Sequence, residues 1–423
     1  MPSCTITPGP LKGKITPPPS REIALRLVWG AALGEGGLIG NCPDTPSIRA
    51  LIDVGTQIGA DIAFEKNTAD IFTSGTPLPV DEISCGNNQT SSRFALPLSF
   101  FFGKIANIKN FKIPPSPLAW LDDASAQLGV RITKTSANIS VSGPPEHEWL
   151  EFGARAGEFF APGFMMAMPV ALDNLFFATD DFTMNHPAVQ NTFEALTVFG
   201  IEYSFDKEHG TITIPPDTGY MNRNVDVPPD WKTGSYYLGA LLLAGEGEVM
   251  LWDFSKQPEN KFWDIFRANN LLNTSESGTS IKVKCSLPLY LPPTMDLRPY
   301  PSLLPLAIVF ASQCHRTTKI GPLYPMSKPA LMRAKNIILQ LNKLGANITS
   351  DGAFINVPYF SFNGGEVDSC GDPRVAMALA LAALCANAPV KIKNCEAVDK
   401  VHPFFWGDLK RLGADIKYDK ESK

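Results

Sequence analysis

Charged side chains follow directly on a proline run near the start of the chain. The segment Pro17–Leu33 reads PPPSREIALRLVWGAAL, which predicts a helix beginning just after the prolines. Arg21, Glu22 and Arg26 fall near the start of that helix, where backbone N–H groups have no partner within the helix. Because N–H groups and arginines both attract negative charge, the segment indicates an anion site. The alternative is an ordinary solvated helix start.

Length, charge and cysteine spacing limit the function classes. The chain has 423 residues, which suggests roughly two or three domains. A formal net charge of −5 provides no broad basic surface for nucleic acid, so we expect a small-molecule or protein partner. The eight cysteines form no CxxC pair, and neither a metal site nor a cofactor is indicated. No signal peptide or membrane-spanning segment is recognisable, so we expect a cytoplasmic protein without a membrane partner.

A recurring phrase, in which a helix ends on glycine and a short strand begins, predicts an internal repeat. Its clear copies are Ile58–Ile62, Leu128–Ile132, Phe199–Tyr203, Leu344–Ile348 and Leu412–Ile416. A spacing of about 70 residues, with a degenerate copy at Asn269–Leu272, implies six units. A helical pattern precedes each phrase and strand-like alternation follows it, so each unit is expected to be a compact α/β subdomain.

The six units divide into two domains of three. A second proline-rich turn, Val225–Trp231, falls between the third and fourth units. We therefore predict a discontinuous domain of residues 1–16 and 230–423 and an inserted domain of residues 17–229. The hinges are expected near residues 14–19 and 226–230. Two connections between lobes of similar size favour closure around a ligand held between them.

Seven sequence blocks resemble the signature blocks of the enolpyruvyl transferase family, most of all its EPSP synthase branch, and they occur in the family's order. They are Ser20–Leu33, Pro43–Ile62, Cys85–Arg93, Asp230–Gly245, Ser327–Ile348, Gly371–Leu384 and Asp399–Ala414. The resemblance covers nearly the whole chain. It implies an α/β fold of two domains, an inside-out α/β barrel with three βαβαββ units in each domain. It does not by itself transfer the reaction.

The carboxylate half of the family's phosphoenolpyruvate site is retained. Arg333 and Arg374 match the two arginines that hold the carboxylate in the family, and Lys400 matches its C-terminal lysine. Asp372 also fits the family pattern, whereas the usual histidine beside it is Pro373. The resemblance therefore implies that this chain still binds a carboxylate.

The phosphate half differs from the family. Arg21 stands at a lysine position, Glu22 at a serine position and Gln89 at a small glycine position. No arginine stands at the family's phosphate arginine, and Lys112 is the nearest cation. Three positions match the family here: Asn87, Thr90 and Arg93. A glutamine side chain at residue 89 would project into space that the phosphate occupies in the family.

The ring-substrate side is also altered. Arg26 matches the family's ring-binding arginine, but Glu158 stands where the family has a neutral donor. Asn185 and Ala188 replace a serine and a tyrosine. A phosphate facing Glu158 would meet a repulsion of about 1 kcal/mol or more at a few ångström even in water. The sequence thus disfavours a phosphorylated shikimate as ligand.

The acid and base of the family are both missing. The family's aspartate position holds Ser302, and its Lys-Glu pair falls at Pro329 and Ala330. Lys328 lies one place early, and Asp296 is a possible stand-in. Proton transfer to and from the methylene carbon, which enolpyruvyl transfer requires, would then depend on one of these two residues.

These substitutions favour an enzyme of specialised metabolism that acts without phosphoenolpyruvate. We expect elimination (a dehydratase or lyase) or cyclisation of an anionic, shikimate-like or enol carboxylate, carried out by a monomer. Glu22 or Glu158 would be the general base, and Arg21 and Lys400 would stabilise developing negative charge. The expected substrate-binding residues are Arg26, Asn87, Gln89, Thr90, Arg93, Ser302, Lys328, Arg333, Asp372 and Arg374. The alternatives are enolpyruvyl transfer to an unphosphorylated acceptor and a non-catalytic binding protein.

Overall fold

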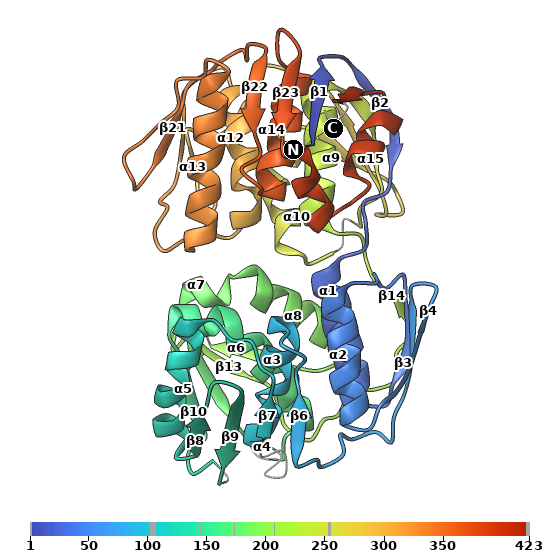
Figure 1. Cartoon of the computed structure of the whole chain (residues 1–423), viewed down its shortest axis with the longest axis vertical. Coiled ribbons are helices and arrows are strands. Elements are labelled where there is room, and N and C mark those ends of the chain that lie inside the picture. The colour runs from blue at the N-terminus through green and yellow to red at the C-terminus, as the bar shows by residue number, and fades with distance from the viewer. Residues whose placement is uncertain are drawn as a thin grey trace. The chain divides into compact units, whose positions relative to one another are not determined.

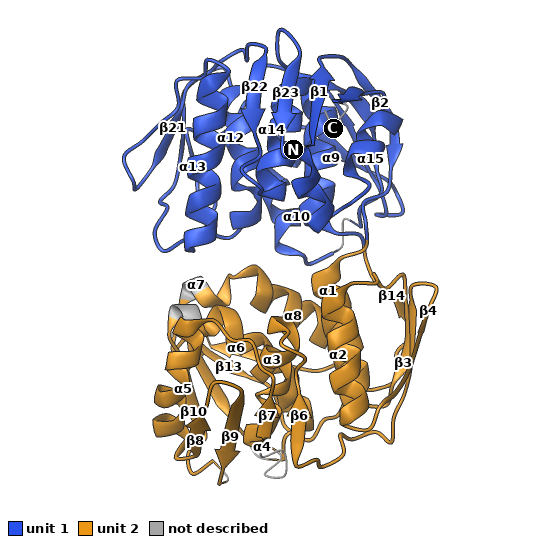
Figure 2. Ribbon diagram, viewed as in Figure 1, with its two compact units in different colours: residues 1–18, 229–423 blue, residues 19–228 orange. Residues whose placement is uncertain are grey.

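The chain divides into two compact units in the computed structural model (Figure 2). The structure describes residues 2–101, 107–143, 145–172, 174–206, 208–252 and 255–419. Unit 1 comprises Met1–Pro18 and Pro229–Lys423, and unit 2 comprises Pro19–Pro228. The chain therefore passes between the units twice, at residues 18–19 and 228–229, which lie inside the predicted hinge segments.

Prolines at both crossings have no backbone N–H, so the neighbouring residues provide the backbone hydrogen-bond donors there. In unit 2 the Ser20 N–H donates to the Pro228 carbonyl at 2.8 Å. In unit 1 the Asp230 N–H donates to the Pro18 carbonyl, also at 2.8 Å. Proline has no N–H, so the backbone hydrogen bonds at each crossing come from the residue that follows the prolines. These two residues, Ser20 and Asp230, are the N-caps of α1 and α9, so the bonds fix the start of a helix in each unit.

Six four-stranded sheets share one plan, three in each unit (Figure 1). In each sheet one parallel pair of strands is followed by two antiparallel pairings. The strand orders are β14-β3-β5-β4, β6-β7-β9-β8 and β10-β11-β13-β12 in unit 2, and β16-β17-β15-β2, β18-β19-β21-β20 and β22-β23-β1-β24 in unit 1.

The strands of unit 2 are β3 (Gly37–Gly40), β4 (Asp61–Glu65), β5 (Thr68–Phe72), β6 (Glu82–Ser84), β7 (Asn107–Lys109), β8 (Arg131–Lys134), β9 (Asn138–Ser142), β10 (Trp149–Phe152), β11 (Phe176–Thr179), β12 (Ser204–Asp206), β13 (Thr211–Thr213) and β14 (Val225–Asp226). Those of unit 1 are β1 (Ser3–Thr7), β2 (Leu11–Ile15), β15 (Gly245–Val249), β16 (Leu272–Thr274), β17 (Ile281–Lys284), β18 (Thr294–Met295), β19 (Thr318–Ile320), β20 (Thr349–Ser350), β21 (Ile355–Val357), β22 (Gly365–Asp368), β23 (Val390–Lys393) and β24 (Asp415–Tyr418).

The helices of unit 2 are α1 (Arg21–Leu33), α2 (Pro46–Gln57), α3 (Gln89–Ala95), α4 (Leu98–Phe101), α5 (Pro115–Leu128), α6 (Ala154–Ala167), η1 (Met168–Val170), α7 (Asp181–Met184) and α8 (Pro187–Val198). Those of unit 1 are α9 (Trp231–Ala244), α10 (Pro258–Phe262), α11 (Asp264–Ala268), η2 (Pro301–Leu303), α12 (Leu304–Ser312), α13 (Lys328–Lys343), α14 (Pro373–Leu384), η3 (Cys395–Lys400) and α15 (Phe405–Arg411).

Each copy of the repeated phrase leads into the antiparallel edge strand of one sheet. These edge strands are β4, β8, β12, β16, β20 and β24. The degenerate copy at Asn269–Leu272 runs into β16, so it marks a real unit. The predicted fold class, an α/β fold of six similar units, is confirmed.

Helices with apolar residues on nearly all faces form the interior of each unit. In unit 1, α9, α12 and α14 are buried along almost their whole length, as an all-round apolar helix must be. Gly239 allows their close approach, because a Cβ there would lie 2.9 Å from Leu306 and Leu381. In unit 2, α1 is buried from Ile23 onward. No helix within the described ranges combines the length and the apolar character needed to cross a membrane.

Candidate functional site

A polar pocket of about 370 Å³ opens in unit 2 at the starts of α1 and α3. It is lined by Arg21, Glu22, Ser47, Asn87, Asn88, Gln89, Thr90, Arg93 and Lys112. Most of the residues predicted for the rewritten phosphate half of the site therefore lie together. Three cationic side chains and one carboxylate give the lining a formal excess of two positive charges.

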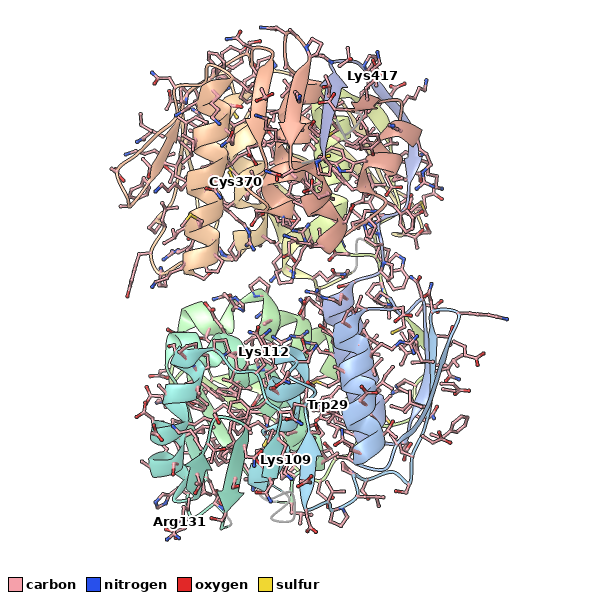
Figure 3. The ribbon with its side chains drawn as sticks, viewed as in Figure 1. Trp29, Lys109, Lys112, Arg131, Cys370 and Lys417 are labelled. Carbon is pink, nitrogen blue, oxygen red and sulfur yellow. The ribbon has the colours of Figure 1, made fainter. Side chains whose placement is uncertain are left out.

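The loop before α3 turns sharply to bring its polar residues to the pocket. Gly86 and Asn87 both adopt positive φ angles, of 58° and 53°, and the Asn87 N–H donates to the Asn110 carbonyl at 2.6 Å. Asn88 caps α3, since its Oδ1 accepts from the Thr90 N–H at 2.8 Å. The Lys112 N–H donates to Ser92 Oγ at 2.8 Å, which fixes the backbone of Lys112 beside α3 (Figure 3).

Glu22 is surrounded by guanidinium groups. Its Oε1 lies 3.0 Å from Arg21 Nη2, and its Oε2 lies 3.6 Å from both Arg26 Nη1 and Arg93 Nη2. The Glu22 side chain is 20% exposed and that of Arg93 14% exposed, so these charges interact in a partly desolvated place. The arrangement stabilises the ionised carboxylate, which opposes the predicted use of Glu22 as a proton acceptor.

Arg26, which the sequence predicts to bind a ring substrate, has no exposed surface in this structure. Its Nε donates to Thr192 Oγ1 at 2.8 Å, its Nη1 to the Glu22 carbonyl at 2.6 Å and its Nη2 to the Ala188 carbonyl at 2.6 Å. Burial, together with the positive charge of Arg93, lowers the pKa of Arg26 to about 9. Arg26 therefore ties α1 to α8 and holds the backbone of Glu22 in place.

Glu158, the second predicted base, is not brought into this pocket. It lies half-buried on α6, and it is not among the residues that line the cavity around Glu22. Its negative charge consequently does not belong to the anion pocket of unit 2.

The predicted carboxylate-binding residues gather at the N-terminus of α14 in unit 1. Asp372 caps that helix, with its Oδ1 accepting from the Arg374 N–H at 2.8 Å, while its Oδ2 lies 2.8 Å from Arg333 Nε. Lys400 Nζ donates to the Gly371 carbonyl at 3.1 Å, just before the helix. Arg374 is 9% exposed, and its guanidinium carbon lies 5.7 Å from the ring centre of Tyr236.

The two predicted stand-ins for the missing acid and base differ in their surroundings. Asp296 receives hydrogen bonds from Arg298 Nε at 3.0 Å and from Arg298 Nη2 at 2.7 Å, which holds its carboxylate in an ion pair. Lys328 is the exposed first residue of α13, the helix that also carries Arg333.

Ser302 contacts a buried carboxylate that the sequence did not single out. Its Oγ donates to Glu259 Oε1 at 2.9 Å, and its carbonyl accepts from the Tyr236 hydroxyl at 3.3 Å. Glu259 has no exposed surface, and this burial raises its pKa. Residues 259 and 302 lie in separate short helical turns, and no motif links them, so only folding brings them together.

Within the described residues, no group of histidine, cysteine, aspartate and glutamate side chains is arranged to hold a metal ion.

Known proteins resemble this chain over its whole length. Residues 6–409 match the family model of EPSP synthase (3-phosphoshikimate 1-carboxyvinyltransferase). The chain is 27% identical over 435 residues to the 3-phosphoshikimate 1-carboxyvinyltransferase of Clostridium novyi, covering 98% of each protein. It is 25% identical over 422 residues to the enzyme of that name from Aeropyrum pernix, covering 97% of this chain and 96% of the relative.

Solved structures share the fold. EPSP synthase from Acinetobacter baumannii superposes with a TM-score of 0.78 at 18% identity, covering 99% of this chain and all of the other. The enolpyruvyl transferase NikO from Streptomyces tendae gives a TM-score of 0.73 at 16% identity, covering 99% of each chain. At these identities the structures establish the fold alone, whereas the family match extends across both units. The chain belongs to the EPSP synthase family.

Proposed function

We propose that this protein transfers the enolpyruvyl group of phosphoenolpyruvate to a hydroxyl group of an unphosphorylated, ring-type acceptor. The observation that carries the proposal is the position of Lys112. It lines the unit 2 pocket together with Arg21 and Arg93, so three cations converge where the sequence had indicated a lost phosphate contact. Phosphate groups are bound by such clusters of charged donors.

Unit 1 holds a second group of cationic side chains, which is suited to binding a carboxylate. Arg374 lies in the first turn of α14, and Arg333 on α13 reaches the cap residue of that helix, whose N-terminus itself favours negative charge. Asp372 holds Arg333 through a single nitrogen in an ion pair at 2.8 Å. A bidentate contact to a carboxylate uses two N–H groups of one guanidinium. The ion pair with Asp372 uses only Nε of Arg333, so the N–H groups of its two terminal nitrogens can still donate to a ligand.

The acceptor is inferred from the substitutions on the ring side. Relatives of this chain are named for transfer to 3-phosphoshikimate. Here Glu158, Asn185 and Ala188 replace the neutral and hydroxyl-bearing residues expected for a phosphorylated ring, and the Ala188 carbonyl is already occupied by Arg26. These changes support an acceptor that carries no phosphate.

The proposed reaction consists of an addition followed by an elimination. The acceptor oxygen bonds to C2 of phosphoenolpyruvate while a proton is added to the methylene carbon. A proton then leaves that carbon as the C–O bond to phosphate breaks, which gives an enolpyruvyl ether and inorganic phosphate. The cations of the unit 2 pocket would stabilise the charge that develops on the departing phosphate.

Elimination without phosphoenolpyruvate is the competing proposal. The observation that favours it is Glu22, whose carboxylate already occupies part of the positive pocket by pairing with Arg21 and Arg93. A substrate with a single carboxylate would need less positive charge than a phosphate dianion does.

The deciding experiment incubates the protein with a panel of hydroxylated ring carboxylates, with and without phosphoenolpyruvate. Inorganic phosphate and product masses are measured. Phosphate release that depends on both substrates, with a matching enolpyruvyl adduct, is the expected result. Loss of water from an acceptor when phosphoenolpyruvate is omitted would overturn the proposal in favour of elimination.

A matched pair of lysine variants tests the role of the pocket. Lys112→Ala should raise the KM for phosphoenolpyruvate by about tenfold, which corresponds to one charge-assisted contact of about 1.4 kcal/mol. Lys109→Ala is the control, because Lys109 pairs with Glu82 on the strand before and does not line the pocket. Equal KM values for the two variants would contradict the assignment of Lys112.

A further inference from the structure

A fully buried carboxylate lies directly behind a partly exposed serine in unit 1. Glu259 on α10 has no exposed surface, whereas Ser302 on η2 retains some. Glu259 Oε1 accepts from Ser302 Oγ at 2.9 Å, and Oε2 has no hydrogen-bond partner among the described residues. Burying a carboxylate oxygen without a hydrogen-bond partner lowers the stability of the folded protein, so the presence of Glu259 at this position calls for an explanation.

The charged and titratable groups around Glu259 are few and of mixed sign. Asp230, the N-cap of α9, raises the pKa of Glu259, and Lys232 in the first turn of α9 lowers it. The charge of Glu259 also acts on Tyr300, which directly precedes η2. Among the described residues, no guanidinium group forms an ion pair or a hydrogen bond with Glu259. Burial is the dominant effect and raises the pKa of Glu259, although the bond from Ser302 partly opposes the rise. A carboxylate in such a place is a stronger base than one in water.

Two contacts connect this pair to the predicted carboxylate-binding residues of unit 1. The Ser302 carbonyl accepts from the Tyr236 hydroxyl at 3.3 Å. The guanidinium of Arg374 lies 5.7 Å from the centre of the Tyr236 ring. Glu259 is thus joined through Ser302 and Tyr236 to the cluster in which Arg374, Asp372 and Arg333 lie.

We propose that Ser302 and Glu259 form a proton relay for the hydroxyl group that reacts, an inference that rests on the function proposed above. As the acceptor oxygen bonds to carbon, its proton passes to Ser302 Oγ and the proton of Ser302 passes to Glu259 Oε1. One O–H bond of the acceptor breaks, one O–H bond of Glu259 forms, and Ser302 ends as it began. The carboxylate becomes neutral, and no other reactant is needed. Ser302 is the group that touches the substrate, and Glu259 acts through it.

The first test does not depend on any activity. Melting temperatures of the whole protein are measured across pH for the wild type and Glu259→Gln. Because the folded-state pKa of Glu259 is raised, its contribution to stability is full at low pH and is lost as pH rises through that pKa. The glutamine variant should therefore gain stability relative to the wild type as pH rises. A difference that is the same at every pH would overturn the inference.

A second Glu–Ser pair in unit 1 provides the control. Ser280 Oγ donates to Glu248 on the surface of the sheet formed by β15 and β17, and the pKa of Glu248 is lowered by this bond. For Glu248→Gln the trend has the opposite sign, because stability contributed by Glu248 is present above its unfolded-state pKa and lost as pH falls. Ser302→Ala should move the pH at which Glu259 titrates upward, whereas Ser280→Ala should not. No shift in Ser302→Ala would show that the pair is uncoupled and would contradict the relay.

The second test uses turnover of phosphoenolpyruvate with an acceptor that works. Glu259→Gln and Ser302→Ala should each lower kcat by about 10²–10⁴-fold with little change in KM, and both should remove the same limb of the pH profile of kcat. The double variant should be no slower than either single variant. Full kcat with an unchanged pH profile in Glu259→Gln would refute the relay. If the wild type itself releases no phosphate with any acceptor, the proposed function fails, and the melting experiments still decide whether Glu259 and Ser302 titrate as a pair.

Discussion

Glu22→Gln is expected to turn the unit 2 pocket into a stronger anion site. The carboxylate of Glu22 lies 3.0 Å from Arg21 Nη2 and 3.6 Å from Arg93 Nη2. Replacing it by a neutral amide of the same size raises the formal positive excess of the lining from two charges to three. An anion bound to these arginines would also no longer face a negative charge a few ångström away.

The size of the effect follows from Coulomb's law. Two unit charges 4 Å apart interact by about 1 kcal/mol in water and about 4 kcal/mol at an effective dielectric constant of 20. Because half of the Arg21 side chain is exposed, a value near the lower end applies. A gain of about 1–2 kcal/mol corresponds to roughly 5–30-fold tighter binding of phosphate or phosphoenolpyruvate.

The same substitution should cost stability. Removing one partner of a buried ion pair typically costs about 3–5 kcal/mol. Arg26 keeps its three hydrogen bonds, one of them to the Glu22 backbone, so a smaller loss of about 1–3 kcal/mol is expected. Urea unfolding measures this loss separately from binding.

Calorimetric titration of inorganic phosphate and of phosphoenolpyruvate, at low and at high salt, provides the assay. Asp44→Asn is the matched control, because Asp44 forms a well-aligned but exposed pair with Arg49 elsewhere in unit 2. The control should leave both affinity and stability essentially unchanged, because an exposed ion pair contributes little. A folded Glu22→Gln protein that binds both anions equally or more weakly than the wild type would refute the electrostatic reasoning.

Three further substitutions test the packing that positions the sites. Arg26→Met should lower the free energy of unfolding by about 3–5 kcal/mol in urea titrations, because it removes three buried hydrogen bonds to α1 and α8 and one of the arginines that pair with Glu22. Asp372→Ala should cost about 1–2 kcal/mol through loss of the α14 cap, and Asp372→Asn should restore most of that stability without restoring the ion pair to Arg333. Gly239→Ala should lower the melting temperature by a few degrees, since the new methyl group overpacks against α12 and α14 at about 1–3 kcal/mol.

The fold could be predicted because its signals are local and repeated. A glycine that ends a helix and a short strand that follows it are set by neighbouring residues, and six copies reinforce one another. The weak copy at Asn269–Leu272 was recognisable only by its spacing from the others. In the same way, a segment such as Val375–Leu384 is apolar on every face, and that alone indicates a buried helix.

The candidate site was less predictable because its contacts join residues far apart in the chain. The charged residues at the start of α1 were identified from the sequence, but the burial of Arg26 depends on α8, more than 160 positions away. Lys112 could be named only as the nearest cation, and its place in the pocket depends on the hydrogen bond to Ser92. Glu259 carried no local signal at all, since its chemistry comes from being enclosed.

Glu22 and Glu259 have different surroundings, and this contrast bears on which of the two carboxylates can move a proton. Glu22 pairs with Arg26 and Arg93, whose charged forms burial disfavours, so a proton on Glu22 would remove a negative charge that stabilises both arginines. Among the described residues Glu259 has no ion pair with a guanidinium group, and burial raises its pKa, which makes it a stronger base. When two carboxylates of one protein differ in this way, the better candidate for acid–base chemistry is the one whose negative charge is not fixed by ion pairs. The arginine–glutamate exchange at the start of α1 is therefore expected to change how an anion is bound, and the proposed relay assigns the proton chemistry to unit 1.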